Sequence, residues 1–271
     1  MFLTAAVVAL GSIGVIASAL RYRWRCSWRN AIDRLCTAPP SEPFKKKKLA
    51  PPIERLVGMQ SEDPVEMPAF IEVLQEGTLY MSPGSKGMRI SARQIFMTGA
   101  PGFVWNAKGS LPMPFFARDE YICGVGKMAV SIAGILPIGQ TSGREMDESS
   151  LVRYAAEAVL FPKALADPSL VEWKGCDSKC AEALIRHLNA QSFITFEFGR
   201  DGNVAKAKGI RYRKENAMMI KRQWWGTYGN YRQIDGHTIP TSMEGWWETD
   251  AGPFKYIDMR ITGIKEWRDC D

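Results

Sequence analysis

Histidine and recognisable catalytic motifs are scarce in this chain of 271 residues. Its two histidines, His187 and His237, lie in no His-Glu-x-x-His sequence, and the chain has no phosphate-binding loop or nucleophile motif. His237 follows Asp235-Gly236, so we expect it to lie in a turn. His187 lies in a polar stretch, so we expect His187 to be solvated. The sequence therefore predicts no catalytic residue, no metal site and no cofactor.

Net basic charge is absent outside one segment. Residues 21–48 carry nine basic and two acidic residues, a net charge of +7, so the rest of the chain contributes −1 to the total of +6. A protein that binds nucleic acid needs a basic surface on its folded part. We therefore expect no nucleic-acid partner.

The six cysteines form no recognisable framework. Cys176 and Cys180 are four residues apart, and no second pair completes a zinc site. A disulfide framework is typical of small secreted domains, whereas a domain of this size can fold without one. We predict that the cysteines are free thiols.

Charged side chains are missing from Phe2 to Leu20, a mostly apolar run close to the roughly 20 residues that a membrane-spanning helix needs. A cleavable signal peptide is the alternative, but such a peptide begins with basic residues, and here the basic residues follow the run. They are Arg21, Arg23, Arg25 and Arg29. Because short loops rich in Lys and Arg stay in the cytoplasm, the sequence predicts a single-pass anchor in the bilayer with the following domain in the cytoplasm.

Three segments follow one another along the chain. Residues 1–36 are predicted to form the transmembrane anchor and a juxtamembrane helix, which Pro39-Pro40 ends. Residues 37–50 form a linker rich in Pro and Lys. Residues 51–271 are predicted to form one soluble domain, and Pro51-Pro52 begins a short helix there.

Short runs of β-branched and aromatic residues, separated by Gly, Pro and Asp, indicate a mainly β domain of the α+β class. The predicted strands are Phe70–Met81, Met88–Thr98, Phe103–Leu111, Phe116–Cys123, Met128–Leu136, Leu184–Ala190, Phe193–Phe198, Val204–Tyr212, Ile220–Tyr228, Asn230–Ile234, Thr238–Thr249 and Tyr256–Trp267. One long helix interrupts them, with Asp147 as its N-cap and Pro162 just after its end. About ten to twelve antiparallel strands predict a large curved sheet or half-barrel, with the helix over its concave face.

Aromatic residues are the most informative positive feature, because many lie in strands of the same curved sheet. They either fill the core or line an apolar cavity beneath the helix. The candidates for the cavity are Trp105, Tyr154, Glu157, Phe161, Trp225, Tyr231 and Phe254. Glu157 follows Arg153 by four residues, so the two form a surface ion pair, or Glu157 lies beneath the sheet and orients a buried arginine or tyrosine. In Trp224-Trp225 and Trp246-Trp247, one ring faces each side of the strand.

Five motifs are distributed over residues 51–267. They are Pro101-Gly102-Phe103-Val104-Trp105, the helix of residues 153–162, Gly229-Asn230-Tyr231-Arg232, Ile239-Pro240-Thr241 and Gly252-Pro253-Phe254-Lys255-Tyr256. These motifs resemble a bacterial, membrane-anchored family known only as a domain of unknown function. The hairpin around Asp235-Gly236 is similar to one in periplasmic lipoprotein carriers, whose curved sheet surrounds an apolar cavity. The resemblance implies a curved β domain with an N-terminal anchor in the bacterial inner membrane, and it implies no activity.

The sequence thus predicts a non-enzymatic protein, tethered to the membrane, that binds a lipid or another apolar ligand. Two alternatives stay open. The domain could be an interaction module that docks a membrane partner without a ligand, or an enzyme that acts on lipid. The enzyme would need a polar cluster inside the cavity, and the spacing of the sequence identifies none.

Overall fold

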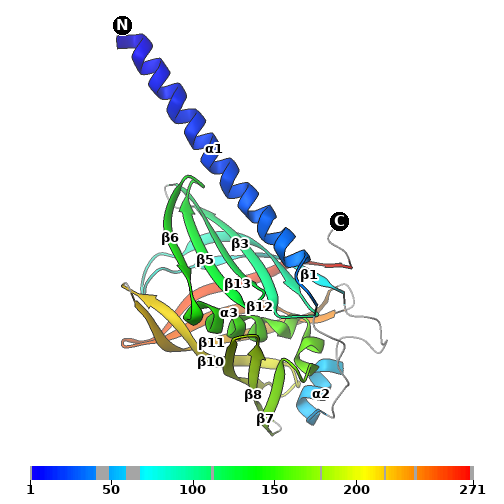
Figure 1. The fold of residues 1–271 in the computed structure, drawn as a ribbon. Helices are drawn as coiled ribbons and strands as arrows, with labels where there is room; N and C mark the ends of the chain where they lie inside the picture. Colours follow the sequence, from blue (N-terminus) through cyan, green and yellow to red (C-terminus); the bar gives the residue numbers. More distant parts are fainter. Residues whose placement is uncertain are drawn as a thin grey trace.

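An antiparallel sheet of 13 strands makes up most of the chain (Figure 1). The computed structural model describes residues 2–40, 49–58, 68–110, 113–177, 179–216, 218–234 and 237–268. The strands are β1 (Phe70–Leu79), β2 (Met88–Met97), β3 (Gly102–Ser110), β4 (Pro114–Ile122), β5 (Val125–Ile132), β6 (Leu136–Ser142), β7 (Val171–Cys176), β8 (Cys180–His187), β9 (Ala190–Phe198), β10 (Val204–Glu215), β11 (Met218–Ile234), β12 (His237–Thr249) and β13 (Gly252–Trp267). In space their order is β6-β5-β4-β3-β2-β1-β13-β12-β11-β10-β9-β8-β7.

The sheet consists of two meanders that join where the first strand meets the last. Strands β1 to β6 are successive neighbours, and so are β7 to β13. The join is the antiparallel pairing of β1 with β13, which runs from Phe70 opposite Trp267 to Leu79 opposite Ile257. The sheet curves strongly, as its number of strands predicts (Figure 1). The predicted half-barrel of mainly β structure is therefore confirmed.

Helix α3 (Arg144–Glu157) connects the two meanders and lies between the arms of the curved sheet (Figure 1). It contacts β4, β5 and β6 on one side and β8, β9 and β10 on the other. Its buried side chains, such as Leu151 and Val152, belong to the main core, which also includes the inner faces of the strands. Two short 3-10 turns follow it, Ala158–Leu160 and Pro162–Ala166. The predicted helix on the concave face is thus confirmed.

The helix begins four residues before the predicted position. Its N-cap is Gly143, and Asp147 lies within the first turn. The Asp147 carboxylate accepts a hydrogen bond from the N–H of Gly126 at 2.7 Å, and a Cβ at Gly126 would lie 2.6 Å from Met146 O. Asp147 therefore joins β5 to α3 and does not cap the helix.

The strand prediction misses the two edges of the sheet. The sequence predicts one strand from Met128 to Leu136, but Ala133 and Gly134, with φ of 53° and 70°, form a turn that separates β5 from β6. The sequence also predicts no strand at β7. Edge strands bury less of their surface, and nearly every residue of β6 is exposed, so the alternation of apolar and polar residues is weak there.

Helix α1 (Phe2–Cys36) packs its C-terminal part against the convex face of β2, β3 and β4. Leu35 is fully buried there in a second apolar cluster with Ile95 and Val104. Gly102 makes room for it, since a Cβ at this position would lie 2.8 Å from Leu35 Cδ1. The N-terminal part of α1 projects beyond the sheet (Figure 1). Helix α2 (Pro51–Gly58) begins at the predicted prolines and packs near the second 3-10 turn.

The structure does not support the predicted membrane-spanning helix at Phe2–Leu20. Within the described residues, no helix combines the length and the apolar character that crossing a membrane requires. The backbone is helical from Phe2, but the side chains up to Gly14 lie outside the described residues. From Arg21 onward, after the predicted span, α1 carries several arginines, and Arg21 donates a hydrogen bond to Ala133 O at 3.2 Å.

The prediction of free thiols is confirmed at three cysteines and wrong at a fourth. Cys26, Cys123 and Cys180 are free. Cys36, the last residue of α1, is disulfide-bonded. A domain of this size needs no disulfide to hold its core, but a disulfide can still form at the end of a docked helix.

The two arms of the sheet meet at Tyr121 of β4 and His187 of β8. Tyr121 Oη lies 3.0 Å from His187 Nδ1, and the two rings meet edge to face. Leu188 lies against the turn at Gly124, so the β8–β9 hairpin touches the β4–β5 turn. The prediction of a solvated His187 is wrong, because this contact half-buries the ring. Burial lowers the pKa of His187 to about 4.

We expect His187 to destabilise the protein as the pH falls from about 6.5 to about 4. Its pKa is lower in the folded than in the unfolded state, so the unfolded state binds more protons in this range and the free energy of unfolding falls by about 1–3 kcal/mol. His187→Gln should remove this part of the pH dependence in urea unfolding at about pH 7.5 and about pH 4.5. Carboxylate titration is common to both proteins, and an equal pH dependence in the two would contradict the prediction.

Candidate functional site

A cavity of about 510 Å³ lies between α3 and the inner face of the sheet. Small-molecule sites in proteins usually measure about 300–1,000 Å³. The wall is mainly apolar and comes from both meanders. Representative apolar lining residues are Met88, Phe115, Val130, Met243, Ile257 and Met259. The curvature of the sheet thus leaves a space of ligand size that α3 only partly fills.

Three large apolar side chains mark the mouth of the cavity. Met81, Met128 and Ile138 line the cavity, and they are also 67%, 38% and 55% exposed. Exposed apolar side chains that continue into an apolar cavity are typical of a binding surface. Methionine adds flexibility, because its unbranched side chain adapts to irregular shapes.

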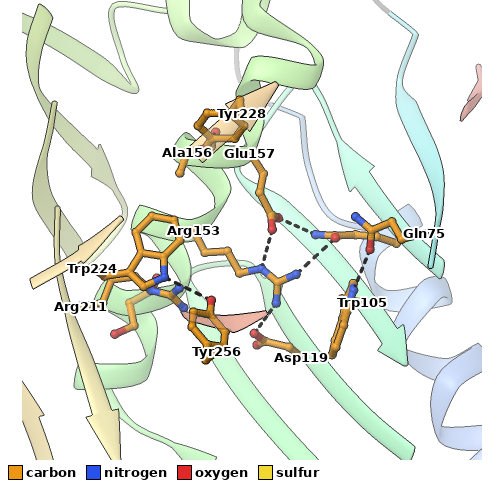
Figure 2. A network of polar contacts seen from close by, with 12 residues as sticks. Gln75, Trp105, Asp119, Arg153, Ala156, Glu157, Arg211, Trp224, Tyr228 and Tyr256 are labelled. Atoms are coloured by element: carbon orange, nitrogen blue, oxygen red, sulfur yellow. Dashed lines mark hydrogen bonds and ion pairs between the residues drawn. The ribbon is translucent and has the colours of Figure 1, made fainter. Parts of the chain in front are cut away.

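A buried arginine lies at the centre of the polar part of the cavity wall (Figure 2). Arg153 of α3 donates to Glu157 Oε1 at 3.0 Å and to Asp119 Oδ2 at 2.6 Å. It also donates to the side-chain oxygen of Gln94, whose nitrogen donates to Glu157 Oε2 at 2.7 Å. The guanidinium lies 5.2 Å from the ring centre of Trp105. This network fixes the last turns of α3 against β2, β3 and β4.

The polar network around Arg153 contains more negative than positive charge. Burial alone would lower the pKa of Arg153, but the charges of Glu157 and Asp119 outweigh it and raise the pKa. Two carboxylates share one guanidinium, which leaves a net charge of −1. The second oxygen of Asp119, Oδ1, is buried without a hydrogen-bond partner among the described residues. This end of the cavity is therefore slightly acidic.

A second buried arginine lies on β10, across the cavity from β4. Arg211 lines the cavity over the rings of Trp224 and Trp247, with its guanidinium carbon 4.9 and 5.6 Å from their centres. Its Nε donates to Ser149 O of α3 at 3.1 Å. Trp224 in turn donates to Tyr256 Oη at 3.2 Å (Figure 2). The wall at this end is thus cationic and aromatic.

Residues 47–265 match the model of a family of unknown function, DUF6920. The chain belongs to this family. The match spans most of the chain and confirms the resemblance that the sequence motifs predict. No curated protein matches the chain.

Three solved structures are similar to this DUF6920 protein at low identity. A provisionally named outer membrane lipoprotein-sorting protein domain from Vibrio parahaemolyticus has 9% identity and a TM-score of 0.45, over 79% of this chain and 90% of that one. A DUF1329 family protein from Desulfovibrio piger has 12% identity and the same score, over 79% and 91%. A LolA superfamily protein from Nitrosomonas europaea has 10% identity and a TM-score of 0.34, over 81% and 93%. Likenesses this distant carry no argument about what the cavity binds.

Three of the seven predicted cavity residues of the DUF6920 domain line the cavity. They are Trp105, Glu157 and Phe254. Trp105 donates to Gln75 Oε1 at 3.0 Å, and Glu157 holds Arg153 beneath the sheet rather than at the surface (Figure 2).

The other four predicted residues lie elsewhere in the DUF6920 domain. Tyr154 and Phe161 are core residues with ring centres 5.6 Å apart, and Tyr154 donates to Met97 O. Tyr231 donates to Val204 O at 2.7 Å and packs at the margin of the core. Trp225 faces outward, where it stacks on its cross-strand neighbour Trp246.

Several tryptophan and charged residues that line the cavity were not predicted from the sequence. Each Trp-Trp pair does place one ring on each face, but the inner members are Trp224 and Trp247. Arg211 is missed because Ile210 beside it is exposed, the reverse of the usual order on a strand. Asp119 and Glu120 point to opposite faces as adjacent strand residues must, and only Asp119 reaches the cavity.

Replacing Arg153 should destabilise the domain strongly. Arg153→Met leaves two buried carboxylates without a cation, and we expect the free energy of unfolding to fall by about 3–5 kcal/mol. The matched control is Arg144→Met, which removes the exposed i,i+4 pair with Glu148 on the same helix and should cost less than about 1 kcal/mol. Urea unfolding measures both, and equal losses would contradict a structural role for the buried network.

Proposed function

We propose that this DUF6920 protein binds a lipid or another apolar ligand in the cavity between α3 and the sheet. The observation that supports the proposal is the continuous apolar wall, which begins at the exposed Met81, Met128 and Ile138 and extends inward. Transfer of an apolar chain from water to such a wall is favourable by about 25 cal/mol per Å² of buried surface. The curved sheet supplies the wall, and α3 supplies the cover.

The polar groups of the wall favour binding over catalysis. Arg153 and Gln94 satisfy both oxygens of Glu157 and one oxygen of Asp119. Within the described lining, no histidine or cysteine is present to act as a base or nucleophile. The network therefore serves to hold α3 in place above the cavity.

A charge at the mouth should weaken binding of an apolar probe. Met128→Glu should lower the affinity for the neutral dye N-phenyl-1-naphthylamine about tenfold, because the apolar chain would lie beside a carboxylate that needs water. The matched control is Met113→Glu, which changes an exposed methionine that is not among the lining residues. Dye fluorescence with the full-length chain measures both affinities.

An absence of saturable dye binding to the wild-type chain, together with no lipid in an organic extract of the purified protein, would overturn the proposal. In that case the domain would be better explained as a module that docks a protein partner. An equal loss of affinity in Met128→Glu and Met113→Glu would place the dye outside the cavity and would also contradict the proposal.

Attachment to the bacterial inner membrane through Phe2–Leu20, with the domain in the cytoplasm, stays a prediction. Its support is the charge pattern, with the arginines directly after the apolar run. The disulfide at Cys36 points the other way, because disulfides persist in oxidising compartments. The side of the membrane is therefore the part of the prediction that most needs a test.

The exposed free thiol of Cys123 offers that test. A membrane-impermeant maleimide added to spheroplasts should leave a cytoplasmic Cys123 unlabelled until the cells are lysed, and Cys123→Ser identifies the labelled site. The chain should also resist extraction from membranes by alkaline carbonate. Labelling before lysis would contradict the cytoplasmic location and agree with the disulfide at Cys36, whereas carbonate-soluble protein would contradict the anchor.

A further inference from the structure

Arg211 is a buried cation without an acidic partner in the described part of the chain. It is 7% exposed, and its one hydrogen bond to the described residues runs from Nε to the backbone oxygen of Ser149. Within the described residues, the N–H groups on Nη1 and Nη2 bond to no acceptor, and no carboxylate forms an ion pair with Arg211. Buried charges are normally paired, because an unpaired charge loses its hydration without compensation.

Arg153, in the wall of the same cavity, provides an internal comparison. Its side chain is 14% exposed, and it bonds to two carboxylates and a side-chain amide. Apart from its bond to Ser149 O, Arg211 has among the described residues only the faces of Trp224 and Trp247, which attract a cation weakly. The fold thus supplies acceptors for the guanidinium of Arg153, whereas Arg211 lines the cavity with N–H donors that bond to no described acceptor.

The charges around Arg211 favour an anion at this end of the cavity. Arg213 and Lys214, two and three residues further along β10, also line the cavity, and neither forms an ion pair within the described residues. The lining carboxylates are bonded elsewhere, Asp119 and Glu157 to Arg153 and Glu244 to Lys255. The cavity therefore changes from slightly acidic near Asp119 to basic along β10.

We infer that Arg211 binds the anionic headgroup, a carboxylate or a phosphate, of an amphiphile whose apolar chain lies in the cavity. The inference rests on the proposed function and specifies the class of ligand. A guanidinium binds such groups through two parallel N–H···O bonds, and Nη1 and Nη2 have the donors to form them. Arg213 and Lys214 add positive charge to the same part of the cavity wall.

The test compares two ligands that differ only in the headgroup. Oleate and oleyl alcohol compete with N-phenyl-1-naphthylamine for the full-length protein, and we expect oleate to bind at least about tenfold more tightly. Arg211→Gln should weaken oleate binding about tenfold and leave oleyl alcohol binding unchanged. The matched control is Arg200→Gln, an exposed arginine in the β9–β10 turn, which should change neither affinity.

The outcomes separate this inference from the proposed function. Equal affinities of the wild-type protein for oleate and oleyl alcohol would overturn the headgroup site and leave the apolar site intact. Binding of neither ligand would overturn the proposed function itself. Acetate that competes as well as oleate would show a site for free anions and overturn the amphiphile. Since the wild-type comparison needs no variant, it remains decisive if Arg211→Gln fails to fold, and Arg211→Lys, which keeps the charge, should then retain part of the oleate preference.

Discussion

The pairing of β1 with β13 is the contact on which the rest of the structure depends. It joins the first and last strands of the domain and makes one sheet from two meanders. The cavity takes its lining from both meanders, so its shape exists only when this pairing is formed. Because the partners lie nearly 200 residues apart in sequence, closing that loop carries an entropic cost that local contacts within each meander must offset.

The inner face of the sheet combines two kinds of wall. Apolar side chains dominate it, while a few buried charges occupy set positions on α3, β4 and β10. Arg153 of α3 bonds to Asp119 in the first meander, and the backbone oxygen of Ser149 on the same helix accepts a hydrogen bond from Arg211 in the second. The helix therefore holds the two arms at a fixed separation, and that separation determines the width of the cavity.

Much of the fold could be predicted from the sequence, because the inner strands alternate clearly and turns are marked by Gly, Pro and Asp. The edge strand β6 could not, since it buries too little to impose a pattern, and β7 was missed although its residues 171–174 alternate between apolar and polar. β11 is continuous where two strands were predicted, because Asn230, with φ of 50°, lies within the strand instead of ending it.

The candidate site was harder to predict, because it depends on which face of each strand turns inward. Trp224 faces inward and Trp225 outward, and on β10 Arg211 is buried while Ile210 is exposed. A sequence pattern that favours apolar residues inside cannot anticipate an inward arginine. Departures from the usual pattern of apolar residues inside and polar residues outside concentrate at functional positions, and we interpret the inward Arg211 as such a position.

The docking of α1 has a mechanical consequence. The helix contacts the sheet up to its last residues, before the predicted Pro- and Lys-rich linker. From Arg21, which bonds to the β5–β6 turn, to Phe2 the helix extends about 30 Å at 1.5 Å per residue. If the N-terminus is held at a surface, the stiff helix therefore sets the distance and the orientation of the cavity mouth relative to that surface.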